Sequence, residues 1–163
     1  MIQYYDIQNS PHFVFSVGEN PLEIICTGIL AIPIGEKEKR IVFQKFLDDY
    51  AIALMTKEMI PEIQIYTVPY VLVMARTDDG GYIVALDEDG FSSKRPICYI
   101  SEEGECYQVA SNGKNFLKGG RAWRESRVPY KELRIFASRE EAEKEYDILD
   151  YNPAPMISKE KSE

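Results

Sequence analysis

The sequence predicts an α+β fold in which helices flank an antiparallel β-sheet. Between residues 63 and 110, five short apolar segments alternate with turns rich in Asp, Glu and Gly, and helical patterns lie on either side. Links this short suit antiparallel neighbours, because parallel strands need a crossover of about a dozen residues. The 163 residues can bury a core without disulfides or metal. We therefore expect one domain over residues 1–151 and a loose tail over residues 152–163.

The first third of the chain is expected to be extended and then helical. Residues 13–15 and 22–32 are rich in β-branched and aromatic side chains, as strands are. From Glu36 to Met59, apolar residues recur at spacings of three and four, which predicts an amphipathic helix. Pro61 follows this segment and is expected to end the helix.

The middle third supplies the strands of the expected sheet. Its short apolar segments are residues 63–68, 70–75, 82–86, 97–100 and 106–110. The turns between the later segments contain Asp-Gly or Glu-Gly pairs. Their glycines supply the positive φ that tight hairpin turns require. This pattern predicts a meander, in which each strand pairs with the next along the chain.

The final third returns to helix. Ser111 is the expected N-cap of a short helix over residues 113–118. A strand over residues 133–137 follows. Ser138, with Glu141 three residues later, forms a capping-box pattern that is expected to open a helix reaching about Asp150.

Several function classes are excluded by composition and motifs. The chain has one histidine, His12, and three cysteines, so neither a His-rich metal site nor a four-cysteine zinc site can be assembled. Phosphate-binding loops, serine elbows and calcium-loop spacing are absent. The net charge of −8 disfavours nucleic-acid binding, which depends on Lys and Arg. We therefore expect no metal, no cofactor and no catalytic residue.

The same reading places the protein in the cytoplasm. The first residues lack a basic segment followed by an apolar run, so no signal peptide is expected. The longest apolar runs are about six residues, whereas a membrane span needs about 20. A reducing compartment would keep the three cysteines as thiols.

Charge is distributed unevenly along the chain. Residues 77–106 have a balance of −6, and residues 111–134 have a balance of +5. If the acidic run forms a surface, it could steer a basic partner. The candidate contacts are Asp78, Asp79, Asp87, Glu88, Asp89 and Glu102. The candidate anion-binding residues of the basic run are Arg121, Trp123, Arg124 and Arg127. Alternatively, strands and turns scatter these charges over unrelated faces.

The segment from Tyr70 to Asp87 has a recognisable order of features. A hydrophobic strand is followed by an Asp/Gly-rich turn and by a strand that begins with an aromatic residue and ends in Leu-Asp. A hairpin strand over residues 97–100 and a segment over residues 109–117 that ends in Phe-Leu complete the order. Over residues 63–118 the chain thus resembles the SUKH superfamily, which groups fungal cell-wall-assembly regulators with bacterial toxin-immunity proteins.

Two features depart from the superfamily pattern. Its members usually start with a helix that carries a Leu-Pro-x-x-Tyr-x-x-Phe-Leu type signature. This chain starts with expected strands, and residues 43–47 of its long helix carry Phe-Gln-Lys-Phe-Leu without the Leu-Pro. Residues 119–163 lie outside the resemblance.

The resemblance implies an α+β fold and a binding role, and it carries over no catalytic residue. Our leading hypothesis is an intracellular, non-enzymatic immunity protein whose acidic surface masks a bacterial toxin, often a nuclease. The alternative is a small hydrolase or ligand-binding enzyme that acts on an anionic substrate through Arg121, Arg124 and Arg127 or through buried carboxylates. A regulator or scaffold without a toxin partner is a third hypothesis.

Overall fold

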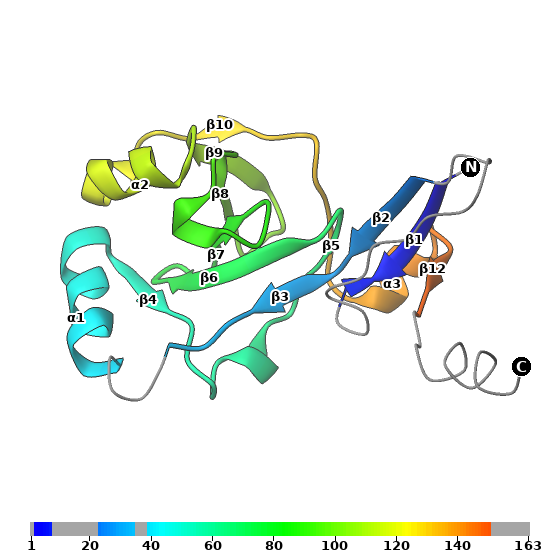
Figure 1. The fold of residues 1–163 in the computed structure, drawn as a ribbon, viewed down its shortest axis with the longest axis horizontal. Helices are drawn as coiled ribbons and strands as arrows, with labels where there is room; N and C mark the ends of the chain where they lie inside the picture. The colour runs from blue at the N-terminus through cyan, green and yellow to red at the C-terminus, as the bar shows by residue number, and fades with distance from the viewer. Residues whose placement is uncertain (1, 8–22, 35–38, 151–163) are drawn as a thin grey trace, which may run out of the picture.

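A computed structural model describes residues 2–7, 23–34 and 39–150 of the chain (Figure 1). These residues form three α-helices and twelve strands, mostly in antiparallel sheets, which confirms the α+β class. The strand expected at 13–15, His12 and the tail at 152–163 lie outside the described residues.

The large sheet contains four of the five strands of the predicted meander, whereas the strand expected over residues 63–68 lies in another sheet. Six of its seven strands lie in the order β10-β9-β8-β7-β6-β3, and β4 also pairs with β6. The strands are β3 (Ile29–Ala31), β4 (Ile52–Leu54), β6 (Val71–Thr77), β7 (Tyr82–Ala85), β8 (Ile97–Ile100), β9 (Cys106–Ala110) and β10 (Val128–Pro129). The pairings from β6 to β9 are antiparallel, as expected from the short turns, and β10, which was not predicted, also pairs antiparallel with β9. Only β3 enters the sheet parallel to its neighbour.

Two smaller sheets lie beside the meander. A parallel sheet has the order β12-β1-β2, with strands β12 (Ile148–Leu149), β1 (Ile2–Asp6) and β2 (Glu23–Thr27). An antiparallel pair joins β11 (Arg134–Phe136) to β5 (Tyr66–Val68). Figure 1 shows the parallel sheet at one end of the molecule, beyond the large sheet.

Gly28 divides the strand expected over residues 22–32. Its φ of 101° lies in the region that favours glycine, and it separates β2 of the small sheet from β3 of the large sheet. The Gly28 N–H donates to the Thr67 carbonyl at 2.7 Å, and the Thr67 hydroxyl donates back to the Gly28 carbonyl at 2.8 Å. One segment therefore serves two sheets, which corrects the expectation of a single strand.

The first helix is shorter than the pattern predicted. α1 (Lys39–Tyr50) ends where Ala51 adopts a φ of 58°, and the chain continues as β4 instead of extending the helix to Met59. Leu54, which fits the helical spacing, is buried together with Ile52 in β4, where both strand residues pair with β6. A 3-10 helix, η2 (Ile60–Glu62), contains Pro61.

The two later helices have one expected cap and one unexpected cap. In α2 (Gly113–Gly119), the cap is Asn112, whose side chain accepts from the Asn115 N–H at 2.8 Å, so the expectation of Ser111 is wrong. In α3 (Arg139–Glu143), Ser138 accepts from the Glu141 N–H as predicted. However, α3 does not reach Asp150, because the chain turns back to pair β12 with β1.

The core lies on both faces of the large sheet. On one face, α1, α2 and the 3-10 helix η4 (Gly120–Arg124) cover a cluster that includes Tyr50, Ile83 and Phe116. On the other face, Val84 and Leu133 belong to a second cluster, as the alternation of a strand requires. Among the described residues, no helix is long and apolar enough to cross a membrane.

Candidate functional site

The six predicted acidic contacts lie at two ends of the large sheet. Asp78 and Asp79 precede β7, whereas Asp87, Glu88 and Asp89 follow it, so the length of β7 separates the two groups. Four residues of strand span about 13 Å. Glu102 joins the first group, because its carboxylate lies 3.2 Å from where a Cβ on Gly80 would stand. The structure therefore brings together three residues at each end and not all six.

The end that carries Asp78 and Asp79 is occupied by the basic segment of the same chain. Arg124 forms an ion pair with Asp78. The hydroxyls of Thr77 and Tyr99 donate to the two carboxylate oxygens of Asp79, the latter at 2.7 Å. Charges that are far apart in the sequence thus neutralise one another at this end of the sheet.

Asp79 is held as a carboxylate by this arrangement. Partial loss of contact with water alone would raise its pKa. The hydrogen bonds from Thr77, Tyr99 and the Gly81 N–H and the charge of Arg127 lower the pKa below the ordinary 3.8. Conversely, burial and the Asp79 carboxylate raise the pKa of Tyr99 to about 12. The Arg127 guanidinium lies 4.4 Å from the centre of the Tyr99 ring. These interactions are those of a structural polar network.

Arg121 and Trp123 hold the end of α1. The buried Trp123 donates its indole N–H to the Tyr50 carbonyl at 2.7 Å, and the Arg121 guanidinium donates to the Asp48 carbonyl at 3.0 and 2.9 Å. The last carbonyls of a helix have no partner within the helix, so these side chains supply one. All four predicted anion-binding residues therefore have partners inside the chain.

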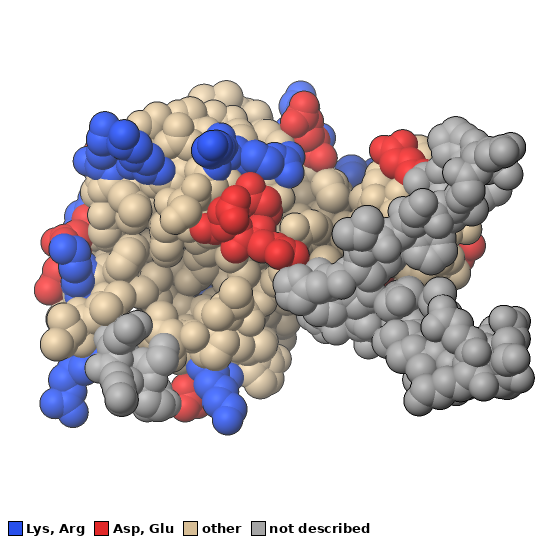
Figure 2. Space-filling model, viewed as in Figure 1, with Lys and Arg blue, Asp and Glu red and all other residues tan. Residues whose placement is uncertain are grey.

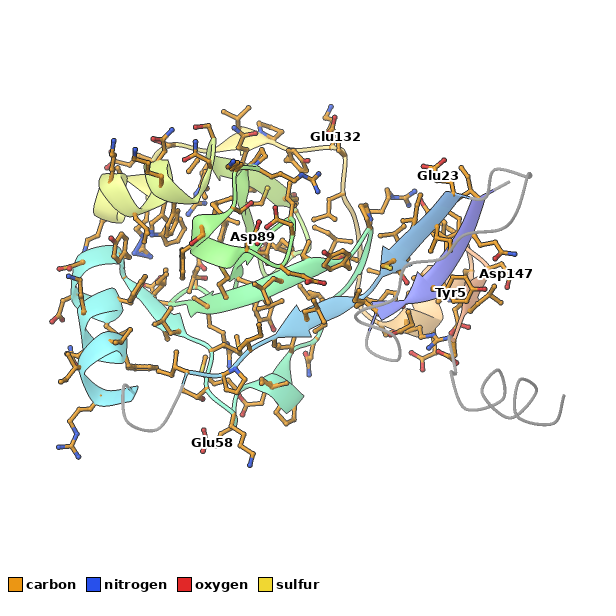
Figure 3. The ribbon with its side chains drawn as sticks, viewed as in Figure 1. Tyr5, Glu23, Glu58, Asp89, Glu132 and Asp147 are labelled. Carbon is orange, nitrogen blue, oxygen red and sulfur yellow. The ribbon has the colours of Figure 1, made fainter. Side chains whose placement is uncertain are left out.

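The other end of the sheet carries the acidic cluster, which we define as Asp87, Glu88 and Asp89. One Asp87 oxygen accepts from the Asp89 N–H at 3.0 Å, and the other accepts from the Ser93 hydroxyl at 2.9 Å. Both donors are neutral, so they orient the carboxylate without cancelling its charge. Asp and Glu side chains form a patch on the face viewed in Figure 2, and Asp89 lies there beside the short helix η3 (Figure 3).

The field of the acidic cluster extends to neighbouring groups. Burial raises the pKa of Tyr70, and the charges of Glu88 and Asp87 raise it further. Burial and the charge of Glu88 likewise raise the pKa of the Cys26 thiol. The nearby charge of Arg95 lowers the pKa of Tyr70 and so partly offsets the negative charge of the cluster on this side.

An apolar groove begins where the acidic cluster ends. Asp89 is followed by η3 (Gly90–Ser92), and Gly90 and Phe91 line a cavity of about 260 Å³. Val42 and Phe46 of α1 also line the cavity. The remaining lining residues are Ile32, Ile34, Leu54, Leu72, Val73 and Met74. Figure 2 shows a hollowed, uncharged surface beside the acidic patch.

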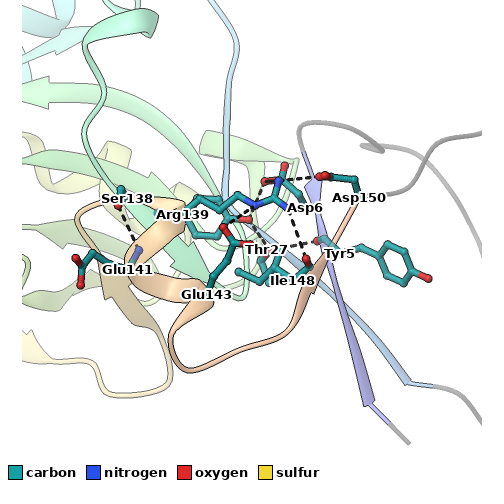
Figure 4. A network of polar contacts seen from close by, with 10 residues as sticks. Tyr5, Asp6, Thr27, Ser138, Arg139, Glu141, Glu143, Ile148 and Asp150 are labelled. Atoms are coloured by element: carbon teal, nitrogen blue, oxygen red, sulfur yellow. Dashed lines mark hydrogen bonds and ion pairs between the residues drawn. The ribbon is translucent and has the colours of Figure 1, made fainter.

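A buried polar network joins the parallel sheet β12-β1-β2 to α3 (Figure 4). The Tyr66 hydroxyl donates to Asp6 at 2.8 Å, and Arg139 donates to the same Asp6 oxygen at 3.2 Å and to Asp150 at 2.7 Å. Asp6 and Arg139 also line a cavity of about 610 Å³. Burial raises the pKa of Tyr66, so this hydroxyl stays protonated as the donor to Asp6.

The chemistry available to the described residues is limited. Asp6 is the one buried carboxylate among them, whereas acid–base catalysis by paired carboxylates needs two. No group of three His, Cys, Asp or Glu side chains in residues 2–7, 23–34 and 39–150 could hold a metal. The three cysteines are free thiols, and the adjacent Cys106 thiol together with burial raises the pKa of Cys98.

Sequence reasoning missed both the groove and the Asp6 network. The groove combines side chains from β3, α1, β4, β6 and η3, whose spacing in the chain gives no common motif. Asp6 and Arg139 are 133 residues apart. An acidic run next to Gly90-Phe91 was the one local signal for the groove. No family model matches this chain, and comparisons with curated proteins and with solved structures likewise give no match.

Proposed function

We propose that the chain is an intracellular, non-enzymatic binding protein of SUKH type that neutralises a basic bacterial toxin. The acidic cluster would steer the toxin by long-range attraction, and the bound chain would then cover the toxin's basic active-site surface. The resemblance over residues 63–118 is the basis for the proposed class of protein. The position of the acidic cluster is the basis for the proposed binding surface.

A single contrast between the two ends of the sheet supports this choice of surface. At one end, Arg124 neutralises Asp78, and Thr77 and Tyr99 hold Asp79. At the other end, Asp87 is held by neutral donors. We therefore set Asp78 and Asp79 aside and choose the acidic cluster as the surface, with Glu102 lying away from it beside Gly80. The geometry favours binding over hydrolysis, because the arginines of the enzyme hypothesis have structural partners.

The proposal is tested by co-expression with the product of the adjacent gene. If that product is toxic to a bacterial host, co-expression of the full chain should restore growth, and the two proteins should co-purify at low salt. An unrelated basic protein, lysozyme, serves as the control for non-specific attraction. The proposal is wrong if growth is not restored and the two purified proteins do not associate.

A further inference from the structure

We infer that the apolar groove beside the acidic cluster binds an apolar side chain of a basic segment on the partner protein. This inference rests on the proposed binding function and specifies the segment that is recognised. The segment would carry Lys or Arg next to Leu, Phe or Met. Its cations would meet Asp87, Glu88 and Asp89, and its apolar side chain would enter the groove.

The groove is built from packed walls. Phe91 of η3 stacks on Phe116 of α2, with ring centroids 5.7 Å apart, and it also contacts Phe46 of α1 at 5.2 Å. Gly90 adopts a φ of 60° and lies close to Leu72 and Met74 at the floor of the groove. Because these contacts belong to the core, the groove is formed before any partner arrives.

The size and lining of the groove fit an anchoring side chain. Pockets for drug-sized ligands occupy about 300–1,000 Å³ and carry several polar groups. This groove has about 260 Å³, and all the residues that line it are apolar side chains or glycine. Buried apolar anchors of this kind dominate the affinity of many protein interfaces.

Exposed apolar side chains border the groove. Ile32, which lines the groove, is 65% exposed, and Ile41, the residue before Val42 on α1, is 77% exposed. Exposure of large apolar side chains next to a pocket marks an interaction surface. A bound segment would cover Ile32 together with the pocket.

Charge selects which segment binds. The acidic cluster directly precedes Gly90 in the chain, so a peptide seated in the groove has carboxylates within reach at one end. The carboxylates of the acidic cluster would repel an acidic segment and attract the cations of a basic segment. The occupant we infer is therefore a basic and apolar segment of a partner protein.

Three labelled nine-residue peptides test the inference on the full chain. The first has a central Phe-Leu pair flanked by lysines, the second replaces Phe-Leu with Ser-Ser, and the third replaces the lysines with glutamates. Fluorescence anisotropy gives the affinities, and methyl NMR spectra locate the bound peptide. We expect the first peptide to bind at least about tenfold more tightly than either of the others. Methyl resonances of Ile32, Val42 and Met74 should shift.

A matched pair of variants distinguishes binding in the groove from non-specific binding to exposed apolar side chains. Ile32→Ser should remove the preference for Phe-Leu over Ser-Ser. Val128→Ser is the control, because Val128 is 63% exposed on β10 and does not line the groove. Both positions are exposed, so both variants should fold. Equal loss of the preference in the two variants would overturn the inference.

The remaining outcomes distinguish this inference from the proposed function. If both lysine peptides bind equally and the groove methyl signals do not move, the groove is not used, although capture of a basic partner stands. If the glutamate peptide binds as well as the lysine peptide, the inferred charge selection is wrong. Groove shifts on raising the protein concentration alone would show that a second copy covers the surface and would also overturn it. If no peptide binds, the inference fails, and the growth assay alone decides the proposed function.

Discussion

Tyr99, buried in β8, donates its hydroxyl proton to the exposed carboxylate of Asp79 at 2.7 Å. Thr77 donates to the other oxygen of Asp79, and Arg127 lies over the Tyr99 ring. A residue that the charge pattern suggested as a partner contact is therefore tied to the chain's own core. This relationship distinguishes acidic residues that stabilise the fold from those that are candidates for binding.

The stability of the protein should fall on acidification through the titration of Asp79. Its pKa in the folded protein lies below the ordinary 3.8, so the folded state favours the carboxylate. The stabilisation is present above pH 3.8 and is lost as the pH falls through the lower, folded pKa. Urea unfolding at a series of acidic pH values should show a shallower decline for Asp79→Asn than for the wild type. Parallel curves for the two proteins would show that Asp79 does not contribute.

Gly113 should tolerate no side chain. A Cβ at this position would stand 2.1 Å from the Phe91 carbonyl oxygen, and the Gly113 N–H donates to the Ser93 carbonyl at 2.8 Å. Gly113→Ala should therefore destabilise the protein by about 3 kcal/mol, the upper end of the usual cost of overpacking. Gly119→Ala is the control, since its Cβ would meet only Ala122 at 3.8 Å. Thermal unfolding of both variants measures the difference, and similar melting temperatures would contradict the packing described.

Asn112 and Ser111 offer a direct comparison of the observed and the expected caps of α2. Asn112→Ala removes the acceptor for the Asn115 N–H and should cost about 1 kcal/mol of unfolding free energy. Ser111→Ala removes a contact between exposed side chains and should cost less, within about 0.5 kcal/mol. Chemical denaturation of the two variants decides the order, and a larger loss for Ser111→Ala would reverse the assignment.

The Asp6 network should stabilise the folded protein, and its buried contacts should contribute more than its exposed ones. Asp6→Asn weakens the buried contacts with Tyr66 and Arg139 and should cost about 2 kcal/mol, less than a fully buried ion pair, because Arg139 is partly exposed. Asp150→Asn, which changes an exposed partner of the same arginine, should cost no more than about 0.5 kcal/mol. Urea unfolding measures both losses. Equal losses would show that burial does not set the strength of these contacts.

Local patterns predicted the elements whose partners are near in sequence. The bounds of β8 and β9 were predicted correctly, because the two strands pair with each other across a short turn. The parallel sheet was not predicted, since Tyr4 pairs with Ile148 at the far end of the chain. The helical spacing of residues 51–55 led to a wrong prediction, also because a pairing distant in the sequence decides the structure of this segment. Pairing of β4 with β6 overrides the local preference.

The candidate site was predictable only in part. The sequence identified Asp87, Glu88 and Asp89 as acidic turn residues, but it could not separate them from Asp78 and Asp79. Distinguishing the two acidic groups requires knowing the direction of each strand and which Lys or Arg side chains lie beside each turn. Both are properties of the folded chain. The groove was not foreseen, because its apolar residues fit the pattern of an ordinary core.

The association rate with the product of the adjacent gene, the toxin partner that we propose, tests most directly whether the acidic cluster is the binding surface. The variant Asp87→Asn/Glu88→Gln/Asp89→Asn removes three charges there, and Glu103→Gln/Glu125→Gln/Glu140→Gln removes three exposed charges elsewhere. Stopped-flow mixing at low salt should show association slowed by at least about tenfold for the first variant and little changed for the second. Equal rates for the two variants would contradict binding through the acidic cluster.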